Sequence, residues 1–431
     1  MSFPAALRLG LLAPAIVSSG LACAHDHALS RGRLVFGDHA KPQIQVLDLD
    51  SGEVTHRFDI PKPNPGLVTL AGGRFVAVKA GGEVRFLDTG LSFESHGDHT
   101  DIEKGQVALL PLVLTGQNPA HIVSGHGQAA VFFDGIRPWD GPSTAKATLL
   151  SLDGLAKPKP PLIDWPSPGP QHGLAVPLAG GRLLVSSPNP AYVKGDDRSA
   201  SSRPGGFSVV RRTKQGWQQL ARLDAQSKPP AGCPLFHGHA ARGELHVFAC
   251  EAGEGGGLLL VDSKAGQLRS RKLAYPDARR SSSLKARPAG RFVVGNYGDS
   301  APYTSLLRID PLAQRLSAQD VMPVPKGQAV CQFVLSENGR RLANLTPDGM
   351  LRIYDLAPDW KEVAAFEAVA PFDCAYGAKT PTPSLVVIGQ SAFVSDPVQG
   401  RIRDYGLETL KQGLDLPVGG APTVLAGGDG G

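Results

Sequence analysis

The chain has 431 residues, of which 42% are hydrophobic and 19% charged, so it is long enough to bury a sizeable core. Its formal net charge of +5 is small, and its lysines and arginines are scattered rather than gathered around aromatic residues, which argues against a nucleic-acid-binding protein. Glycine (52 residues) and proline (37 residues) are abundant, which predicts a chain with many turns.

Residues 1–24 have the pattern of a secretory signal peptide. Arg8 is the only charged residue among them, and an apolar segment follows it as far as an Ala-Cys-Ala cleavage pattern that ends at Ala24. Cleavage there predicts an exported mature protein with no segment inserted in a membrane. Lipidation of Cys23 is the alternative interpretation, although a glycine stands where lipoproteins usually carry leucine.

Residues 25–31 would then form a short N-terminal tail that begins His-Asp-His and precedes the first expected strand. From residue 32 to residue 431 we expect a single domain, because one pattern recurs along that whole length. Each unit has a short β run, as in "GRLVFGD" (32–38), "GRFVAVK" (73–79) or "SLVVIGQ" (384–390), and then a second run that usually ends in aspartate.

This repeat predicts an all-β fold, a β-propeller with four strands in each blade. Short strands between turn residues, repeated with a period of about 40–60 residues, are typical of that architecture. The eight units favour eight blades, and seven remain possible if one unit is irregular. A two-sheet sandwich would explain the short strands but not eight copies in one order. The C-terminal "APTVLAGG" (421–428) matches the start of a unit, so the last strand should complete the first blade and close the ring.

The segment "SHGDHTD" (95–101) is the first concentration of metal-binding side chains in the domain. It falls between the third and fourth strands of the second blade, on the same side of the ring as the turn that holds His126. We therefore group His126 with four residues of that segment as an accessory metal site: His96, Asp98, His99 and Asp101. A solvated polar turn is the alternative.

Three histidines share one position in the repeat. His121, His172 and His237 each come early in the innermost strand of the third, fourth and fifth blades. Innermost strands surround the axis of a propeller, so these rings should converge, and three imidazoles are a suitable ligand set for Zn²⁺. Asp134 ends the neighbouring strand and is the candidate fourth ligand. The alternative is that these histidines only hold loops in place by hydrogen bonding.

An exported protein keeps its cysteines in an oxidising compartment, where disulfides form. Cys233 and Cys250 are placed almost symmetrically about a turn, so they should face each other across a hairpin and form a disulfide. Cys331 and Cys374 fall early in the expected innermost strands of the last two blades. They could bridge those blades or remain free thiols.

The sequence also resembles a known protein family. The signal peptide, the propeller, and the motifs "HGDHTD", "PAHIVSGHG", "VFFDG", "PQHG" and "CPLFHGH" together look like the periplasmic zinc metallochaperones of AztD type. This resemblance implies that the three in-register histidines bind zinc, and that the 96–101 loop and the tail residues His25 and His27 capture or hand over metal. It also implies a periplasmic location and a partner, the solute-binding protein of a zinc ABC importer.

Taken together, these features predict a monomeric, exported zinc chaperone without enzymatic activity. Catalytic motifs such as G-x-S-x-G, a P-loop or H-E-x-x-H are not present in the sequence. Two alternatives stay open: a metal-dependent hydrolase or lactonase on the same scaffold, and an interaction propeller that binds no metal. Histidine sites also bind Cu²⁺ and Ni²⁺, so the sequence alone does not fix the metal. Because histidine must be neutral to bind metal, affinity should fall below about pH 6.

Overall fold

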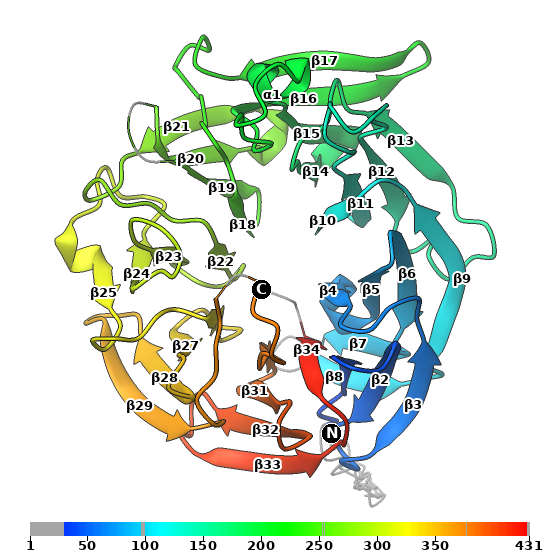
Figure 1. Cartoon of the computed structure of the whole chain (residues 1–431), viewed down its shortest axis with the longest axis vertical. Helices are drawn as coiled ribbons and strands as arrows, with labels where there is room; N and C mark the ends of the chain where they lie inside the picture. The colour runs from blue at the N-terminus through cyan, green and yellow to red at the C-terminus, as the bar shows by residue number, and fades with distance from the viewer. Residues whose placement is uncertain (1–29, 96–99, 252, 254, 376, 429–431) are drawn as a thin grey trace, which may run out of the picture.

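The structure, a computed structural model, describes residues 30–428 except 96–99, 252, 254 and 376. These residues form eight antiparallel four-stranded sheets that surround a central axis as blades (Figure 1). The predicted all-β propeller is therefore confirmed, with eight blades rather than seven. Within the described part of the chain, no helix is long and apolar enough to cross a membrane.

The strands of each blade are named here by their distance from the axis. The innermost strands are β4 (Gly66–Leu70), β10 (Pro119–Gly125), β14 (Ala175–Leu178), β18 (Gly238–Arg242), β22 (Leu284–Ala286), β26 (Gln332–Leu335), β30 (Leu385–Ile388) and β34 (Pro422–Ala426). The second strands are β1 (Arg33–Asp38), β5 (Phe75–Ala80), β11 (Gln128–Phe133), β15 (Arg182–Ser187), β19 (Leu245–Cys250), β23 (Val293–Tyr297), β27 (Arg341–Leu345) and β31 (Ser391–Asp396).

The outer half of each blade is built in the same way. The third strands are β2 (Gln43–Asp48), β6 (Glu83–Asp88), β12 (Lys146–Ser151), β16 (Gly206–Thr213), β20 (Gly257–Asp262), β24 (Ser305–Ile309), β28 (Met350–Asp355) and β32 (Arg401–Gly406). The outermost strands are β3 (Val54–Asp59), β9 (Ala108–Thr115), β13 (Leu162–Pro166), β17 (Gly216–Leu223), β21 (Arg269–Leu273), β25 (Val321–Pro323), β29 (Lys361–Glu367) and β33 (Gln412–Pro417).

A few elements lie outside this plan. The second blade carries an extra hairpin, β7 (Leu91–Ser95) and β8 (Thr100–Lys104), between its third and fourth strands. The helical elements are short: α1 (Pro190–Lys194) and the 3₁₀ turns η1 (Ala71–Gly73), η2 (Ala179–Gly181), η3 (Lys264–Gly266) and η4 (Ala318–Asp320).

The burial of each strand follows from its place in the blade. Second strands are covered on both faces by the neighbouring blades, so they read as continuous apolar runs; Leu34, Val35 and Phe36 of β1 are fully buried. The outermost strand β3 instead alternates between half-buried and exposed residues. The core is accordingly a series of apolar clusters between adjacent blades, such as the one that joins β14, β16 and β19.

The ring is closed by the C-terminal strand, as predicted. β34 pairs antiparallel with β1, with Ala426 opposite Val35, and so completes the first blade (Figure 1). The repeat pattern aligned the run 384–390 with the runs 32–38 and 73–79, which fall on the second strands β1 and β5. This alignment was wrong: the run 384–390 contains β30, an innermost strand, and the second strand of that blade is β31. Both are short buried apolar runs, which periodicity alone does not tell apart.

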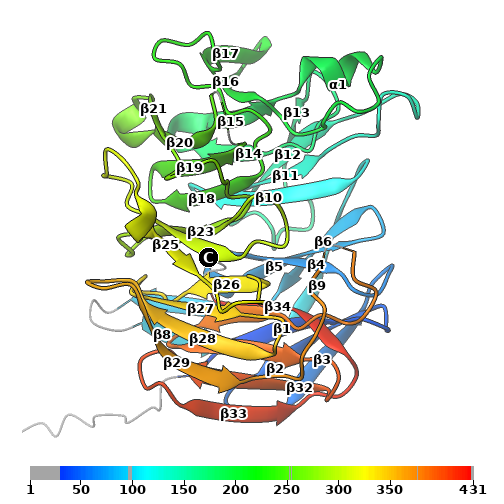
Figure 2. The same ribbon diagram turned by 60° about the vertical axis from the view of Figure 1, so that its left-hand side comes forward.

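Two faces of the ring matter for the site. We call the face with the turns between innermost and second strands, such as those at Gly72 and Gly389, the turn face, and the opposite face the entry face. A cavity of about 870 Å³ is lined by Gly72 and Gly389 together with Phe93 of β7, which places the β7–β8 hairpin on the turn face. Figure 2 shows the arrangement of the blades around the axis in an oblique view.

Candidate metal centre

Three histidines from adjacent blades converge near the entry face. His121 lies in β10, whereas His172 and His237 come just before β14 and β18. The ring centroids are 4.7 Å apart for His121 and His172, 5.5 Å for His172 and His237, and 6.4 Å for His121 and His237. The structure therefore brings together the three side chains that share one position in the repeat.

A bulge in β10 and two closely packed glycines orient the three imidazole rings. The pairing of β10 with β11 shifts register between Pro119 and Ile122, so His121 stands in a bulge, a device that redirects a side chain. His172 and His237 are each followed by glycine, and both glycines approach other atoms closely. A Cβ added to Gly173 would lie 2.4 Å from the Phe132 ring, and one on Gly238 would lie 2.9 Å from the carbonyl oxygen of Ser282.

The Nε2 atoms of His121 and His172 face each other at 3.2 Å. Two ligand nitrogens bound to one tetrahedral zinc, each about 2.0–2.1 Å from it, are themselves about 3.4 Å apart. The first two rings are therefore already spaced as a pair of zinc ligands. His237 is the more distant ring, and among the described residues no three histidine, cysteine or acidic side chains are yet spaced as a complete metal site. Binding would require His237 to move inward.

The other ring nitrogen of two of these histidines has a protein partner. Nδ1 of His172 lies 2.7 Å from Oδ2 of Asp134, and Nδ1 of His237 lies 2.8 Å from the carbonyl oxygen of Ser282. A neutral ring would donate its Nδ1–H in both contacts, which would leave the lone pair on Nε2. Metal-binding histidines in proteins are commonly oriented in this way.

Asp134, the candidate fourth ligand, contacts the His172–Gly173 segment. It follows β11 directly, as predicted, but its Oδ2 contacts His172 and its Oδ1 accepts the backbone N–H of Gly173 at 3.2 Å. The carboxylate thus lies on the Nδ1 side of the His172 ring, whereas the Nε2 atom faces His121. Both oxygens are used to hold the His172–Gly173 segment in position.

Burial favours the neutral form of two rings in this cluster, His121 and His237. It lowers the pKa of His121 to about 3, assisted by the positive charges that His172, His237 and Lys79 would carry. Burial also lowers the pKa of His237, although the hydrogen bond to Ser282 opposes this shift. Neutral imidazole is the form that binds metal, so protons compete at His121 only at a pH below the ordinary range of histidine.

Two cavities meet at the cluster. One, of about 560 Å³, runs along the innermost strands and is lined by His121, His237 and His239. The other, of about 620 Å³, is lined by His172 and His237 together with Arg203 and Tyr303. A donor from outside could therefore reach the three rings without unfolding a blade.

The accessory site expected around the 96–101 loop is only partly within the described residues. His96, Asp98 and His99 lie outside them, as do the tail residues His25 and His27. Asp101 lies in β8, opposite Glu94 of β7. His126 is in the turn after β10, as predicted, and its Nε2 lies 3.3 Å from Oε1 of Glu244 in the corresponding turn of the fifth blade.

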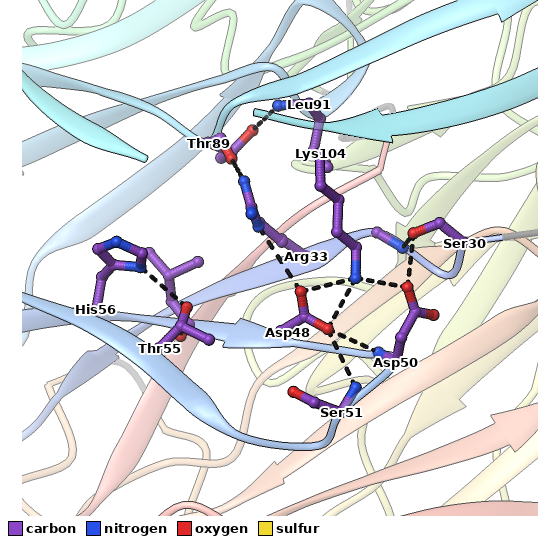
Figure 3. Close-up of polar contacts among 12 residues, drawn as sticks. Ser30, Arg33, Asp48, Asp50, Ser51, Thr55, His56, Thr89, Leu91 and Lys104 are labelled. Atoms are coloured by element: carbon purple, nitrogen blue, oxygen red, sulfur yellow. Dashed lines mark hydrogen bonds and ion pairs between the residues drawn. The ribbon is translucent and has the colours of Figure 1, made fainter. Parts of the chain in front are cut away.

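The hairpin that carries this loop is anchored to the start of the domain (Figure 3). Nζ of Lys104, the last residue of β8, donates to both carboxylate oxygens of Asp48 at 2.7 Å and also contacts Asp50. Asp50 in turn accepts the Ser30 hydroxyl at 2.7 Å. Burial would raise the pKa of Asp48 and of Asp50, but the hydrogen bonds from Lys104 outweigh it and keep both lowered. One charge network thus fixes the roots of the hairpin and of the N-terminal tail.

The sequence interpretation missed a second pair of histidines. Nε2 of His239, in β18, lies 3.3 Å from Nδ1 of His246, in β19. The spacing of His237 and His239 contained a signal, since residues two apart in an extended segment point to the same side, and both line one cavity. His246 could not have been assigned to this pair from spacing alone, because the partner lies across the hairpin.

Two disulfides form among the described residues. Cys233 and Cys250 are bonded, as favoured from the sequence, with Cα atoms 4.8 Å apart. Cys331 and Cys374 are also bonded. Cys374 is in the loop between β29 and β30 rather than in an innermost strand, because that strand begins only at Leu385.

Comparison with known proteins agrees with this architecture. No family model matches the chain. The zinc chaperone AztD of Citrobacter koseri is 28% identical to it over 416 residues, which cover 94% of this chain and 89% of that protein. This chain is a homologue of AztD.

Solved structures of AztD give the same result. The crystal structure of Citrobacter koseri AztD superposes with a TM-score of 0.74 at 27% identity and covers 93% of this chain and 98% of that one. The apo AztD structure from the same organism superposes with a TM-score of 0.73 at 27% identity and covers 92% and 98%. The resemblance to AztD that the sequence motifs indicated is therefore confirmed over nearly the whole propeller.

Proposed function

We propose that this chain is a zinc chaperone that carries Zn²⁺ as cargo on His121, His172 and His237. The observation that carries the proposal is the facing pair of Nε2 atoms at 3.2 Å, with the Nδ1 atom of His172 engaged by Asp134. The homologue AztD is named a zinc chaperone, which supports the same conclusion. That name describes a carrier and not an enzyme, in agreement with the expectation that this chain catalyses no reaction.

Binding and release would both use the unequal spacing of the rings. Zinc would first bind His121 and His172, whose Nε2 atoms are already correctly separated, and then draw His237 inward. Because Asp134 is engaged on the Nδ1 side of His172, the fourth position is left to water or to an incoming donor. The cavity lined by Arg203 and Tyr303 gives such a donor access.

Transfer would then proceed by ligand exchange. A histidine or carboxylate of a partner takes the fourth position, and the most distant protein ligand, His237, is the first to be displaced. We propose as partner the solute-binding protein of a zinc ABC importer, reached by an exported monomer in the periplasm. The loop residues His96, Asp98, His99 and Asp101, together with His25 and His27 of the tail, would capture metal on the turn face, where the hairpin lies.

Zinc titration against a competing chelator tests this function. The mature protein should bind one tight equivalent, and a variant with alanine at His121, His172 and His237 should lose it. A His56→Ala variant is the matched control, since His56 lies on the outermost strand β3. Equal tight binding by the triple variant would reject the proposal. A colorimetric assay of zinc transfer from the loaded protein to a purified solute-binding protein then tests the hand-over.

A further inference from the structure

A groove lies at the outer rim of the ring, between the fourth and fifth blades, whose outermost strands are β17 and β21 (Figure 1). Two adjoining cavities of about 710 and 520 Å³ form it, and Ala221 and Leu268 line both. Gly180, in the turn between β14 and β15, also lines it, so the groove opens towards the turn face, whereas the three histidines converge near the entry face. We call this surface the rim groove.

The floor of the rim groove is apolar. Ala221 and Leu268 are half-buried and pack on the core cluster that joins the two blades. Leu220, which lines the same groove, is 42% exposed, whereas most large hydrophobic side chains of the described residues are buried or half-buried. The described part of the chain therefore leaves an apolar contact surface open to solvent.

The sides of the rim groove are basic. Among the described residues, five cationic side chains line it against the single carboxylate of Asp224; the cations are Arg182, Arg211, Arg222, Lys228 and Arg269. The chain as a whole has a formal net charge of only +5, so positive charge is concentrated on this surface.

Two of these cations have an acidic neighbour. Nη2 of Arg222 lies 2.7 Å from Oδ2 of Asp224, and Arg269 stands opposite Asp262 where β20 pairs with β21. The remaining cations, Arg182, Arg211 and Lys228, make no ion pair with an acidic side chain of the described residues. Their charge is left for an anionic group from outside the chain.

Arg182 and Arg211 stand directly opposite each other where β15 pairs with β16. Like charges in this arrangement are destabilising. Arg182 is fixed there, because its Nε donates to the carbonyl oxygen of Ala179 at 2.9 Å and its Nη1 to that of Gly266, in the fifth blade, at 2.7 Å. Arg211 is exposed at the groove. A carboxylate bound beside the two guanidinium groups would relieve their repulsion.

We propose that the rim groove docks an extended acidic segment of a partner protein. Carboxylates of the segment contact Arg211 and Lys228 on the sides of the groove, and an apolar side chain of the segment covers Leu220. The apolar floor favours a polypeptide, because a small inorganic anion would leave the floor uncovered and a membrane surface is too flat to enter a groove. This docking goes beyond the proposed zinc-carrier function and does not depend on it.

Fluorescence anisotropy tests this docking on the full mature chain, kept metal-free by a chelator. The probe is a labelled synthetic peptide in which aspartates and glutamates flank a single leucine. Arg211→Ser/Lys228→Ser should weaken its binding about 3- to 30-fold, and Leu220→Ser about 3- to 10-fold. Arg340→Ser, at an exposed position of the seventh blade, is the matched control and should bind like the parent protein. Binding should also weaken as the salt concentration rises.

Several results would overturn the proposal. It fails if the parent protein does not bind the peptide, or if Arg211→Ser/Lys228→Ser binds it as tightly as the parent does. It also fails if inorganic phosphate or phosphatidylglycerol vesicles bind more tightly than the peptide and lose binding in the same double variant, because the occupant would then be another anion.

The metal centre gives an independent control. The variant with alanine at His121, His172 and His237 should bind the peptide like the parent protein, whatever its zinc affinity. Loss of peptide binding in that variant would place the peptide at the metal centre and overturn the assignment to the rim groove. Since Arg211, Lys228 and Leu220 are exposed, their replacement should leave the thermal unfolding temperature nearly unchanged.

Discussion

The carboxylate of Asp134 lies 2.7 Å from Nδ1 of His172, on the side of the ring away from His121. If zinc binds as proposed, this contact would make Asp134 a residue that orients the ligand His172, whereas the sequence had suggested Asp134 as a ligand itself. Asp134→Asn should therefore weaken zinc binding about 10- to 100-fold without changing the number of tight equivalents. Chelator competition measures this effect, with Asp164→Asn on the outermost strand β13 as control. Complete loss of the tight equivalent would show instead that Asp134 binds the metal directly.

The two disulfides should differ in their effect on metal binding. Cys233–Cys250 closes the segment that carries His237. Cys331–Cys374 instead joins the start of the seventh blade to the loop that leads into the eighth, and the three histidines belong to other blades. Replacing either pair by serine should lower the free energy of unfolding by about 2–4 kcal/mol. Only Cys233→Ser/Cys250→Ser should also weaken zinc binding. Urea unfolding and chelator competition on both double variants test this, and equal affinities would contradict it.

The metal-free protein should lose stability in acid because of its buried histidines. Burial lowers the pKa of His121 to about 3 and that of His246 to about 4, from an ordinary value of 6.5. As pH falls below about 6.5 the unfolded chain takes up protons at these rings and the folded chain does not, so the free energy of unfolding decreases. The expected loss is roughly 1 kcal/mol per pH unit for each ring.

Urea unfolding between about pH 7 and pH 4.5 measures this dependence. The double variant His121→Asn/His246→Gln should show a shallower decrease than the parent protein, because two of the rings that take up protons on unfolding are gone. His56→Gln should behave like the parent. Identical slopes for the parent and the double variant would mean that these two rings do not set the acid sensitivity.

Lys104 should control the hairpin but not the metal affinity. Its ammonium group joins β8 to Asp48 and Asp50, so Lys104→Met should reduce hydrogen-exchange protection in β7 and β8. The three histidines belong to other blades, and their zinc affinity should remain within about twofold of the parent value, since distant sites usually behave independently. A large fall in affinity at equilibrium would show that the hairpin contributes to the tight site.

The sequence contained most of the fold because the propeller repeats one local pattern. Eight copies of a buried apolar run favoured eight blades over seven, and the unpaired C-terminal segment predicted the closure between β34 and β1. The run at 384–390 was assigned to the wrong strand because β30 and β31 are both short and buried. Local sequence does not distinguish neighbouring strands that have the same surroundings on both faces.

The convergence of the three histidines at the candidate site was also predictable from the repeat. Equal positions in successive units were enough to gather His121, His172 and His237, because the repeat determines which residues face the axis. The contacts that decide each residue's role came from elsewhere in the chain. The Ser282 carbonyl, the Nδ1 contact of Asp134 and the pairing of His239 with His246 depend on side-chain direction and on neighbouring loops. No periodicity encodes those relationships.

A crystal structure of the zinc-loaded mature protein, with anomalous scattering recorded on both sides of the zinc absorption edge, tests the central claim most directly. We predict a strong zinc peak about 2.0–2.1 Å from the Nε2 atoms of His121, His172 and His237. His237 should be displaced towards His121 relative to the ring separation of 6.4 Å described here, with Asp134 still on Nδ1 of His172. If the strongest zinc peak of a fully loaded protein instead lay beside other residues, that result would contradict the proposed site.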